Sequence, residues 1–124
     1  MINIKAVVHA GLLVKDTARS LEFYQGVLGL ELAGARPDLG YPGAWMRVGH
    51  QQIHLMELPD PDAGTERPVH GGRDRHLALS VADIAELRRA LDLAGVAYTH
   101  SKSGRKALFC RDPDGNALEF VEQA

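Results

Sequence analysis

The sequence predicts an α+β fold built from two tandem copies of one βαβββ unit, and three observations support this prediction. First, HAGLLVKD at residues 9–16 matches HLALSVAD at residues 76–83, with His, Leu, Val and Asp at equivalent places. Second, apolar residues at helical spacing follow each of these segments and end at a glycine. Third, three short apolar segments follow each glycine, as expected for strands. Each copy is therefore predicted to be one folded module.

The first module begins with a strand that contains His9. Asp16 follows in the N-cap position, where its carboxylate can accept free amide hydrogens of the first helical turn. Leu21, Tyr24 and Leu28 then recur at helical spacing, and Gly29 predicts the helix end as a left-handed C-cap. Three further strands are predicted at 29–36, 44–49 and 52–58.

The second module repeats this order, starting with a strand that contains His76. Asp83 is its N-cap, and Glu86 three residues later has the spacing of a capping box. Gly95 predicts the end of the helix. The apolar helix positions are Ile84, Leu87 and Leu91, and the three following strands are predicted at 95–100, 106–112 and 116–122.

A segment rich in proline, glycine and charge separates the two copies. The sequence PDPDAGTERPVHGGRD lacks the period of a helix or strand, which is typical of a connection between modules. We therefore expect a single domain over residues 1–124. Its two modules span about 1–58 and 74–124, joined by a linker at 59–73.

Composition restricts the possible functions. Of the 124 residues, 45% are hydrophobic, which suits one globular domain. The net charge is −2 with no basic block, so a nucleic-acid partner is not expected. No apolar run approaches the ~20 residues of a membrane span, and the single cysteine, Cys110, excludes an internal disulfide. These features predict a cytoplasmic protein without a membrane partner.

Four side chains that can bind metals occupy two repeat-matched positions on strands. His9 matches His76, and His54 in QIHLM matches Glu119 in ALEFV. A single strand histidine is usually only hydrogen-bonded or half-exposed, but the matched positions favour a shared role. Because burying a carboxylate without a partner is costly, Glu119 either needs a cation or must point to water. Imidazole and carboxylate groups suit Zn, Ni, Co, Mn or Fe(II). The position of His54 is equally consistent with a polar residue that lines the site without binding the metal.

The segments HAGLLVKD…SLEFYQGVLGLEL, RHLALSVAD and CRDPDGNALEF resemble the vicinal oxygen chelate superfamily. This superfamily includes glyoxalase I, fosfomycin resistance proteins, extradiol dioxygenases and bleomycin resistance proteins. The resemblance implies that the modules form an open, cup-shaped mixed sheet around one divalent metal ion, with His9, His54, His76 and Glu119 as ligands. It also implies a homodimer, in which the site can be shared between subunits.

The same resemblance implies a metalloenzyme acting on a small molecule. With four ligands, the metal would chelate two adjacent substrate oxygens and stabilise an enediolate or oxyanion, as in a glyoxalase-like lyase or isomerase. His54 and Glu119 are then the candidate catalytic bases. If only the other two histidines and Glu119 bind, the triad suits an Fe(II) extradiol-type dioxygenase. A third alternative is a metal-free ligand-binding protein of the bleomycin-resistance kind, although such binders lack the ligand set.

The chain departs from two patterns within this superfamily. Glyoxalase I usually carries glutamate or glutamine at the position of His54, and fosfomycin resistance enzymes carry threonine at that of Gly11. Glu57 and Glu122 are expected to be exposed, because they lie on the opposite strand face from the candidate ligands. Residues expected to contact a substrate are Tyr41, Trp45, Met46 and Phe109 for apolar groups, and Arg67, Arg73 and Arg75 for anions.

Overall fold

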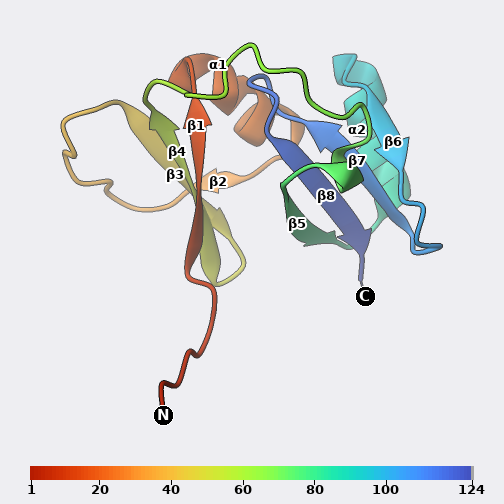
Figure 1. The fold of residues 1–124 in the computed structure, drawn as a ribbon, viewed down its shortest axis with the longest axis horizontal. Helices are drawn as coiled ribbons and strands as arrows, with labels where there is room; N and C mark the ends of the chain where they lie inside the picture. The colour runs from red at the N-terminus through yellow and green to blue at the C-terminus, as the bar shows by residue number, and fades with distance from the viewer. Residues whose placement is uncertain (124) are drawn as a thin grey trace.

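The computed structural model describes residues 1–123, which form two separate four-stranded sheets, one in each half of the chain (Figure 1). The strand orders are β1-β4-β3-β2 and β5-β8-β7-β6, and only the pairs β1/β4 and β5/β8 are parallel. The predicted α+β class with a repeated βαβββ unit is confirmed.

The helices and strands follow the same order in the two halves. The elements are β1 (His9–Val14), α1 (Thr17–Leu21), the π-helical η1 (Glu22–Val27), β2 (Glu31–Leu32), β3 (Gly43–Val48), β4 (Gln51–Glu57), the 3₁₀ turn η2 (Gly71–Arg73), β5 (His76–Val81), α2 (Ile84–Ala94), β6 (Tyr98–His100), β7 (Ala107–Arg111) and β8 (Ala117–Glu122).

The sequence repeat reappears in the strand register. Parallel pairing places Gly11 opposite His54 in the first sheet and Ala78 opposite Glu119 in the second. Each first-strand histidine lies two residues before that pairing position. Since side chains two residues apart share a face of a strand, both candidate donors of each module lie on one face of its sheet.

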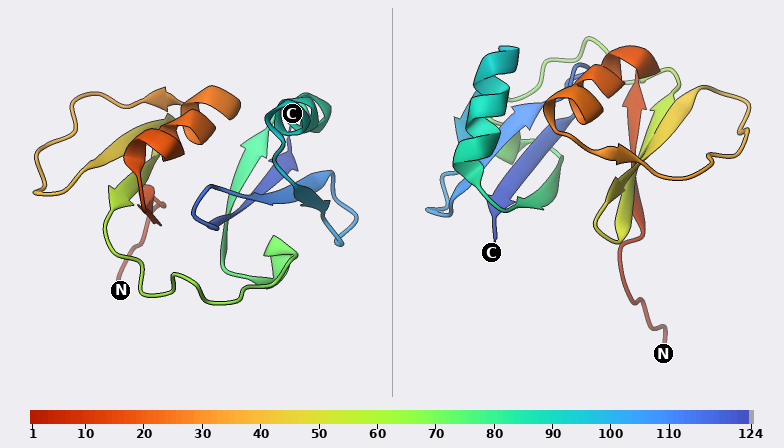
Figure 2. Two further views of the ribbon diagram at one scale, coloured as in Figure 1. Left: turned by 90° about the horizontal axis from the view of Figure 1, so that it is seen from above. Right: turned by 180° about the vertical axis from the view of Figure 1, so that it is seen from behind.

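The other face of each sheet packs against helices, and Figure 2 shows one helical segment lying along each sheet. Ile53 and Leu55 of β4 face this core, as do Leu118 and Phe120 of β8, and all four are buried. Alternation along the strands then directs the candidate donors of β4 and β8 to the side away from the helices. No helix within residues 1–123 is both long enough and apolar enough to cross a membrane.

The first helical segment departs from the predicted helix. After five α-helical residues the chain widens into a π-helical turn, in which Leu28 N donates to Phe23 O over 3.0 Å. Two consecutive aromatic side chains in this wider turn, Phe23 and Tyr24, are both buried. Gly29 ends the segment with φ of 73°, as predicted.

Both helices begin at the predicted aspartates. The Asp16 carboxylate accepts a hydrogen bond from Arg19 N, and the Asp83 carboxylate accepts from Ala85 N and Glu86 N. These bonds satisfy amide hydrogens that have no partner within the first turn.

The last glutamate of each sheet also caps a helix, so the exposure expected for Glu57 and Glu122 was wrong. Glu57 Oε1 accepts from Thr17 N at 2.8 Å, and Glu122 Oε1 accepts from Ile84 N at 3.1 Å. Both side chains are half-buried, and each accepts a hydrogen bond from the amide of the first residue of the helix in its own module. The repeat therefore extends to the bonds that attach each helix to its sheet.

The strand that follows each helix is shorter than predicted. After the glycine that ends each helix, the next residue still bonds back to it: Leu30 N donates to Tyr24 O, and Val96 N donates to Leu91 O, each over 2.9 Å. These residues complete the helix C-cap and cannot pair in a sheet.

A buried hydrogen-bond network joins the two modules within the chain. Tyr24 OH donates to Asp112 Oδ2 over 2.7 Å, and Asn116 Nδ2 donates to the same oxygen and to Leu13 O. Tyr24 is 0% exposed and Asp112 is 5% exposed. Burial raises the pKa of both groups, and the charge of Asp112 raises that of Tyr24 further. We call Tyr24, Asp112 and Asn116 the inter-module joint.

Removing the Tyr24 hydroxyl should weaken this joint. We expect Tyr24→Phe to lower the free energy of unfolding by about 1 to 3 kcal/mol, because Asp112 loses a buried hydrogen bond. Tyr41→Phe, at a half-buried tyrosine of the β2–β3 loop, keeps the ring under Arg36 and is the control, which should have no effect. The pKa of the Tyr24 hydroxyl in the folded protein lies well above its ordinary value of 10.0. Just above pH 10 the folded state therefore keeps the hydroxyl proton, whereas the unfolded state loses it. The wild type should therefore lose stability more steeply than Tyr24→Phe above pH 10 in denaturant titrations. Equal stability of the two proteins would contradict the role of the joint.

Candidate metal centre

The first module presents a stack of three rings on its helix-free face. The His54 ring lies between His9, at a centroid distance of 3.9 Å, and Trp45, at 4.2 Å. His54 Nε2 is also 2.7 Å from Gln52 Oε1. Burial lowers the pKa of His54, and the charges of His9 and Arg36 lower it further, which favours the neutral ring. We call His9, His54 and Trp45 the first half-site.

The second module presents a buried carboxylate held by two nitrogen groups. Glu119 is 4% exposed, its Oε1 lies 3.4 Å from His76 Nε2, and its Oε2 accepts from Arg105 Nη2 over 3.0 Å. The sequence indicated that Glu119 either needs a cation or must point to water, but it did not identify Arg105, which lies in the glycine- and serine-containing loop between β6 and β7. We call His76, Glu119 and Arg105 the second half-site.

The orientation of His76 suits a metal ligand. His76 Nδ1 donates to Asp74 O over 2.8 Å, so a neutral ring carries its proton on Nδ1 and directs the Nε2 lone pair at the Glu119 carboxylate. Two electron-pair donors 3.4 Å apart repel each other unless a proton or a cation lies between them. Ligating histidines in metal sites commonly donate their other N–H to a backbone carbonyl in this way. This half-site therefore fits a divalent cation.

Charged groups from the linker and from β7 hold Asp74, whose carbonyl oxygen accepts from His76. Asp74 Oδ2 accepts from Arg67 Nε at 2.7 Å and from Arg111 Nη1 at 2.9 Å, and hydrogen bonds from these two residues lower the pKa of Asp74 to about 2. Arg75 pairs with Asp62. Arg67 and Arg75 are thus each paired with a carboxylate, and their expected role in anion binding stays a prediction.

The apolar residues expected to contact a substrate do not all lie on the same face of their sheets. Trp45 and Phe109 pair with His54 and Glu119 in register, so they lie on the helix-free faces, and their contact with a substrate stays a prediction. The expected role of Met46 was wrong, since it is 0% exposed in the core.

The four candidate ligands form two pairs that do not meet within the described chain. The structure brings His9 to His54 and His76 to Glu119. Over residues 1–123, no three His, Cys, Asp or Glu side chains lie close enough together to hold a metal ion. The strands that carry the first histidine of each pair, β1 and β5, are both edge strands. One chain therefore presents two half-sites.

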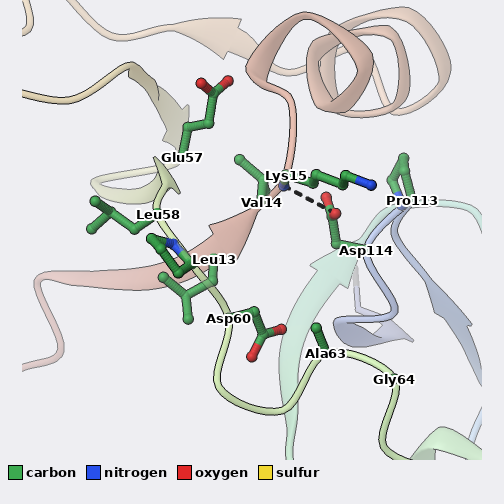
Figure 3. Close-up of a pocket in the computed structure, with 11 residues that line it drawn as sticks. Leu13, Val14, Lys15, Glu57, Leu58, Asp60, Ala63, Gly64, Pro113 and Asp114 are labelled. Atoms are coloured by element: carbon green, nitrogen blue, oxygen red, sulfur yellow. Dashed lines mark hydrogen bonds between the residues drawn. The ribbon is translucent and has the colours of Figure 1, made fainter.

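Three cavities lie near these elements. One of about 500 Å³ lies where β1, β4, the linker and the β7–β8 turn meet (Figure 3), and none of the four candidate ligands lines it. Its wall includes the bond from Lys15 N to Asp114 that supports the contact between modules. A second of about 440 Å³ lies between β1 and β5 and reaches His76. A third of about 360 Å³ is lined by both His76 and Glu119.

Comparison with known proteins identifies the family. The chain is 30% identical over 123 residues to a lactoylglutathione lyase from Haemophilus influenzae, covering 94% of this chain and 91% of that protein. It shares the fold of a glyoxalase family protein from Bacillus anthracis, with a TM-score of 0.79, 24% identity and full coverage of both chains. It also shares the fold of the E126Q mutant of the fosfomycin resistance protein FosX from Listeria monocytogenes, solved with Mn(II), with a TM-score of 0.77, 18% identity, and 98% and 95% coverage. The family model of the Glyoxalase/Bleomycin resistance protein/Dioxygenase superfamily matches residues 6–120, and the chain therefore belongs to this superfamily.

Proposed function

We propose that this protein is a metal-dependent enzyme of glyoxalase-like lyase or isomerase type, acting on a small molecule with two adjacent oxygens. The observation that carries this proposal is the pair of repeat-matched half-sites, each with two donor side chains on the helix-free face of its sheet. The likeness to a lactoylglutathione lyase that spans most of both chains supports the same class of reaction.

In this proposal His9, His54, His76 and Glu119 hold one divalent ion, which is Ni, Co, Zn, Mn or Fe(II). The donor set of three imidazoles and one carboxylate suits these metals, and the FosX structure that shares the fold was solved with Mn(II). When bound, the ion supplies Lewis-acid stabilisation of negative charge on the two substrate oxygens.

The chain's own groups would move the proton. Glu119 is the proposed base that takes a proton from the substrate carbon and returns it to the neighbouring carbon, because it is a buried carboxylate beside the cavity of about 360 Å³. His54 is the second candidate base, with its ring orientation fixed by Trp45 and Gln52. Phe109, beside Glu119 in the sheet, would help to keep water from the reacting carbon.

A complete site in this proposal needs a second copy of the chain. The chain is one domain of two modules in which the half-sites lie apart, and β1 and β5 each have one unpaired edge within residues 1–123. Such edges readily pair with another chain. The extended segment ahead of β1 also exposes apolar side chains that a partner could cover, namely Ile2, Ile4, Val7 and Val8. A homodimer would join the first half-site of one subunit to the second half-site of the other.

One observation favours a second candidate, an Fe(II) extradiol-type dioxygenase. His54 is already engaged on both ring faces and at Nε2, which would leave His9, His76 and Glu119 as a triad with an open side for dioxygen. A metal-free ligand-binding protein is a third candidate, because Arg105 already satisfies the Glu119 charge without a metal.

Replacing Glu119 should abolish metal binding. We expect Glu119→Gln purified from metal-supplemented medium to hold less than about a tenth of the wild-type metal, because a neutral amide is a far weaker ligand than a carboxylate. Mass spectrometry would give the metal identity and the ratio of metal to chain. Glu31→Gln, at an exposed carboxylate of the first sheet, should keep its metal. Unchanged metal affinity in Glu119→Gln would refute the ligand assignment.

Replacing His54 should separate the two enzyme candidates. If four side chains bind the ion, His54→Ala should weaken metal affinity at least about tenfold, since one ligand is lost. His50→Ala, at an exposed histidine in the turn between β3 and β4, is the matched control. Competition with a coloured chelator would measure the affinity. Unchanged affinity together with bound iron would contradict the four-ligand site and favour the dioxygenase.

A further inference from the structure

The cavity beside Glu119 has a strongly cationic wall. It measures about 360 Å³, and Glu119 is the one carboxylate in its lining. Three basic side chains, from η2 and from the β6–β7 loop, line the same cavity. They are Arg73, Lys102 and Arg105.

Two of these cations have no counter-charge in the described structure. Over residues 1–123, neither Arg73 nor Lys102 takes part in an ion pair. A concave wall with surplus positive charge attracts anions more strongly than the same charges spread over a convex surface. The cavity is therefore suited to a negatively charged group.

Arg105 is held at both ends of its guanidinium group. Its Nε lies 3.3 Å from Ser103 Oγ, and its Nη2 donates to Glu119 Oε2 over 3.0 Å. Ser103 Oγ is in turn 2.7 Å from Ser101 Oγ, and both serines line the cavity. A guanidinium group in this position can exchange one oxygen-bearing partner for another, because its planar donors suit any carboxylate or phosphate.

We propose that this cavity is an oxyanion subsite for the substrate, and that Arg105 moves from Glu119 to the substrate's acidic group when a metal ion engages Glu119. The proposal rests on the proposed function, because it uses the same carboxylate. It narrows the substrate class to small molecules that carry a carboxylate, phosphate or phosphonate besides the two adjacent oxygens. Metal and anion then bind cooperatively, since each favours the release of Arg105 from Glu119.

The two half-sites thereby divide the substrate between them. The first half-site offers aromatic faces, with Trp45 stacked on His54. The second offers cations and the two serine hydroxyls. An acidic end of the substrate would lie at the second half-site.

The test uses chelator-treated protein and inorganic phosphate, so that it does not depend on a bound metal. We expect metal-free Glu119→Gln to bind phosphate about tenfold more tightly than the metal-free wild type, because the variant releases Arg105 from a charge-assisted hydrogen bond. The double variant Glu119→Gln/Arg105→Gln should lose this gain. Glu119→Gln/Arg47→Gln, which removes an arginine of the first sheet, should keep it. Isothermal titration would measure each affinity.

Propionate, titrated in parallel, distinguishes a carboxylate from a phosphate as the preferred group. If neither anion gains affinity in Glu119→Gln, or if the gain survives in the Arg105 double variant, the subsite is refuted. These results are independent of metal binding, so they are distinct from a failure of the proposed function, which the metal content of the wild type reveals.

Metal loading of the wild type tests the coupling. Phosphate affinity should rise about tenfold on loading, and Arg105→Gln should remove this rise. If phosphate affinity rises by the same factor in Arg105→Gln, the anion binds to the metal ion directly. That result would contradict the proposal that Arg105 moves from Glu119 to the anion.

Discussion

The buried joint between the modules sets the arrangement on which the site depends. Tyr24 reaches from the first helical segment to Asp112 in the turn between β7 and β8, and Asn116 links the same carboxylate to the end of β1. These bonds fix the modules through their helix side and turns, while the helix-free faces carry the candidate ligands. Within residues 1–123 the two pairs of candidate ligands do not meet, and β1 and β5 each keep one open edge.

The two half-sites are equivalent in position but differ in chemistry. A parallel strand pair positions both, and the final glutamate of each sheet caps the helix of the same module. The first half-site, however, holds a stack of three rings, whereas the second holds a carboxylate between His76 and Arg105. A duplicated scaffold with two different chemical ends suits an asymmetric substrate better than a symmetric one. The superfamily gives the fold, and these side chains give the proposed selectivity.

The sequence predicted features that depend on local pattern. The repeat, the helix caps and the glycine stops follow from residue type and spacing, and the structure bears them out. Features that depend on contacts distant in sequence were missed. The π-helical turn includes Tyr24, which bonds to Asp112 of the second module, and Arg105 meets Glu119 only through the path of its loop. Met46 was misassigned because the sequence alone did not fix which face of β3 meets the core.

Complementation between two inactive variants tests the central claim, a metal site assembled from two copies of the chain. His9→Ala removes a ligand from the first half-site, and Glu119→Gln removes one from the second, so neither dimer alone should bind metal. After equal amounts are mixed and allowed to exchange subunits, half of the dimers are mixed and each contains one intact site. Metal content should then rise to about a quarter of the wild-type level. A metal content that stays at the level of the separate variants, despite proven subunit exchange, would contradict a shared site.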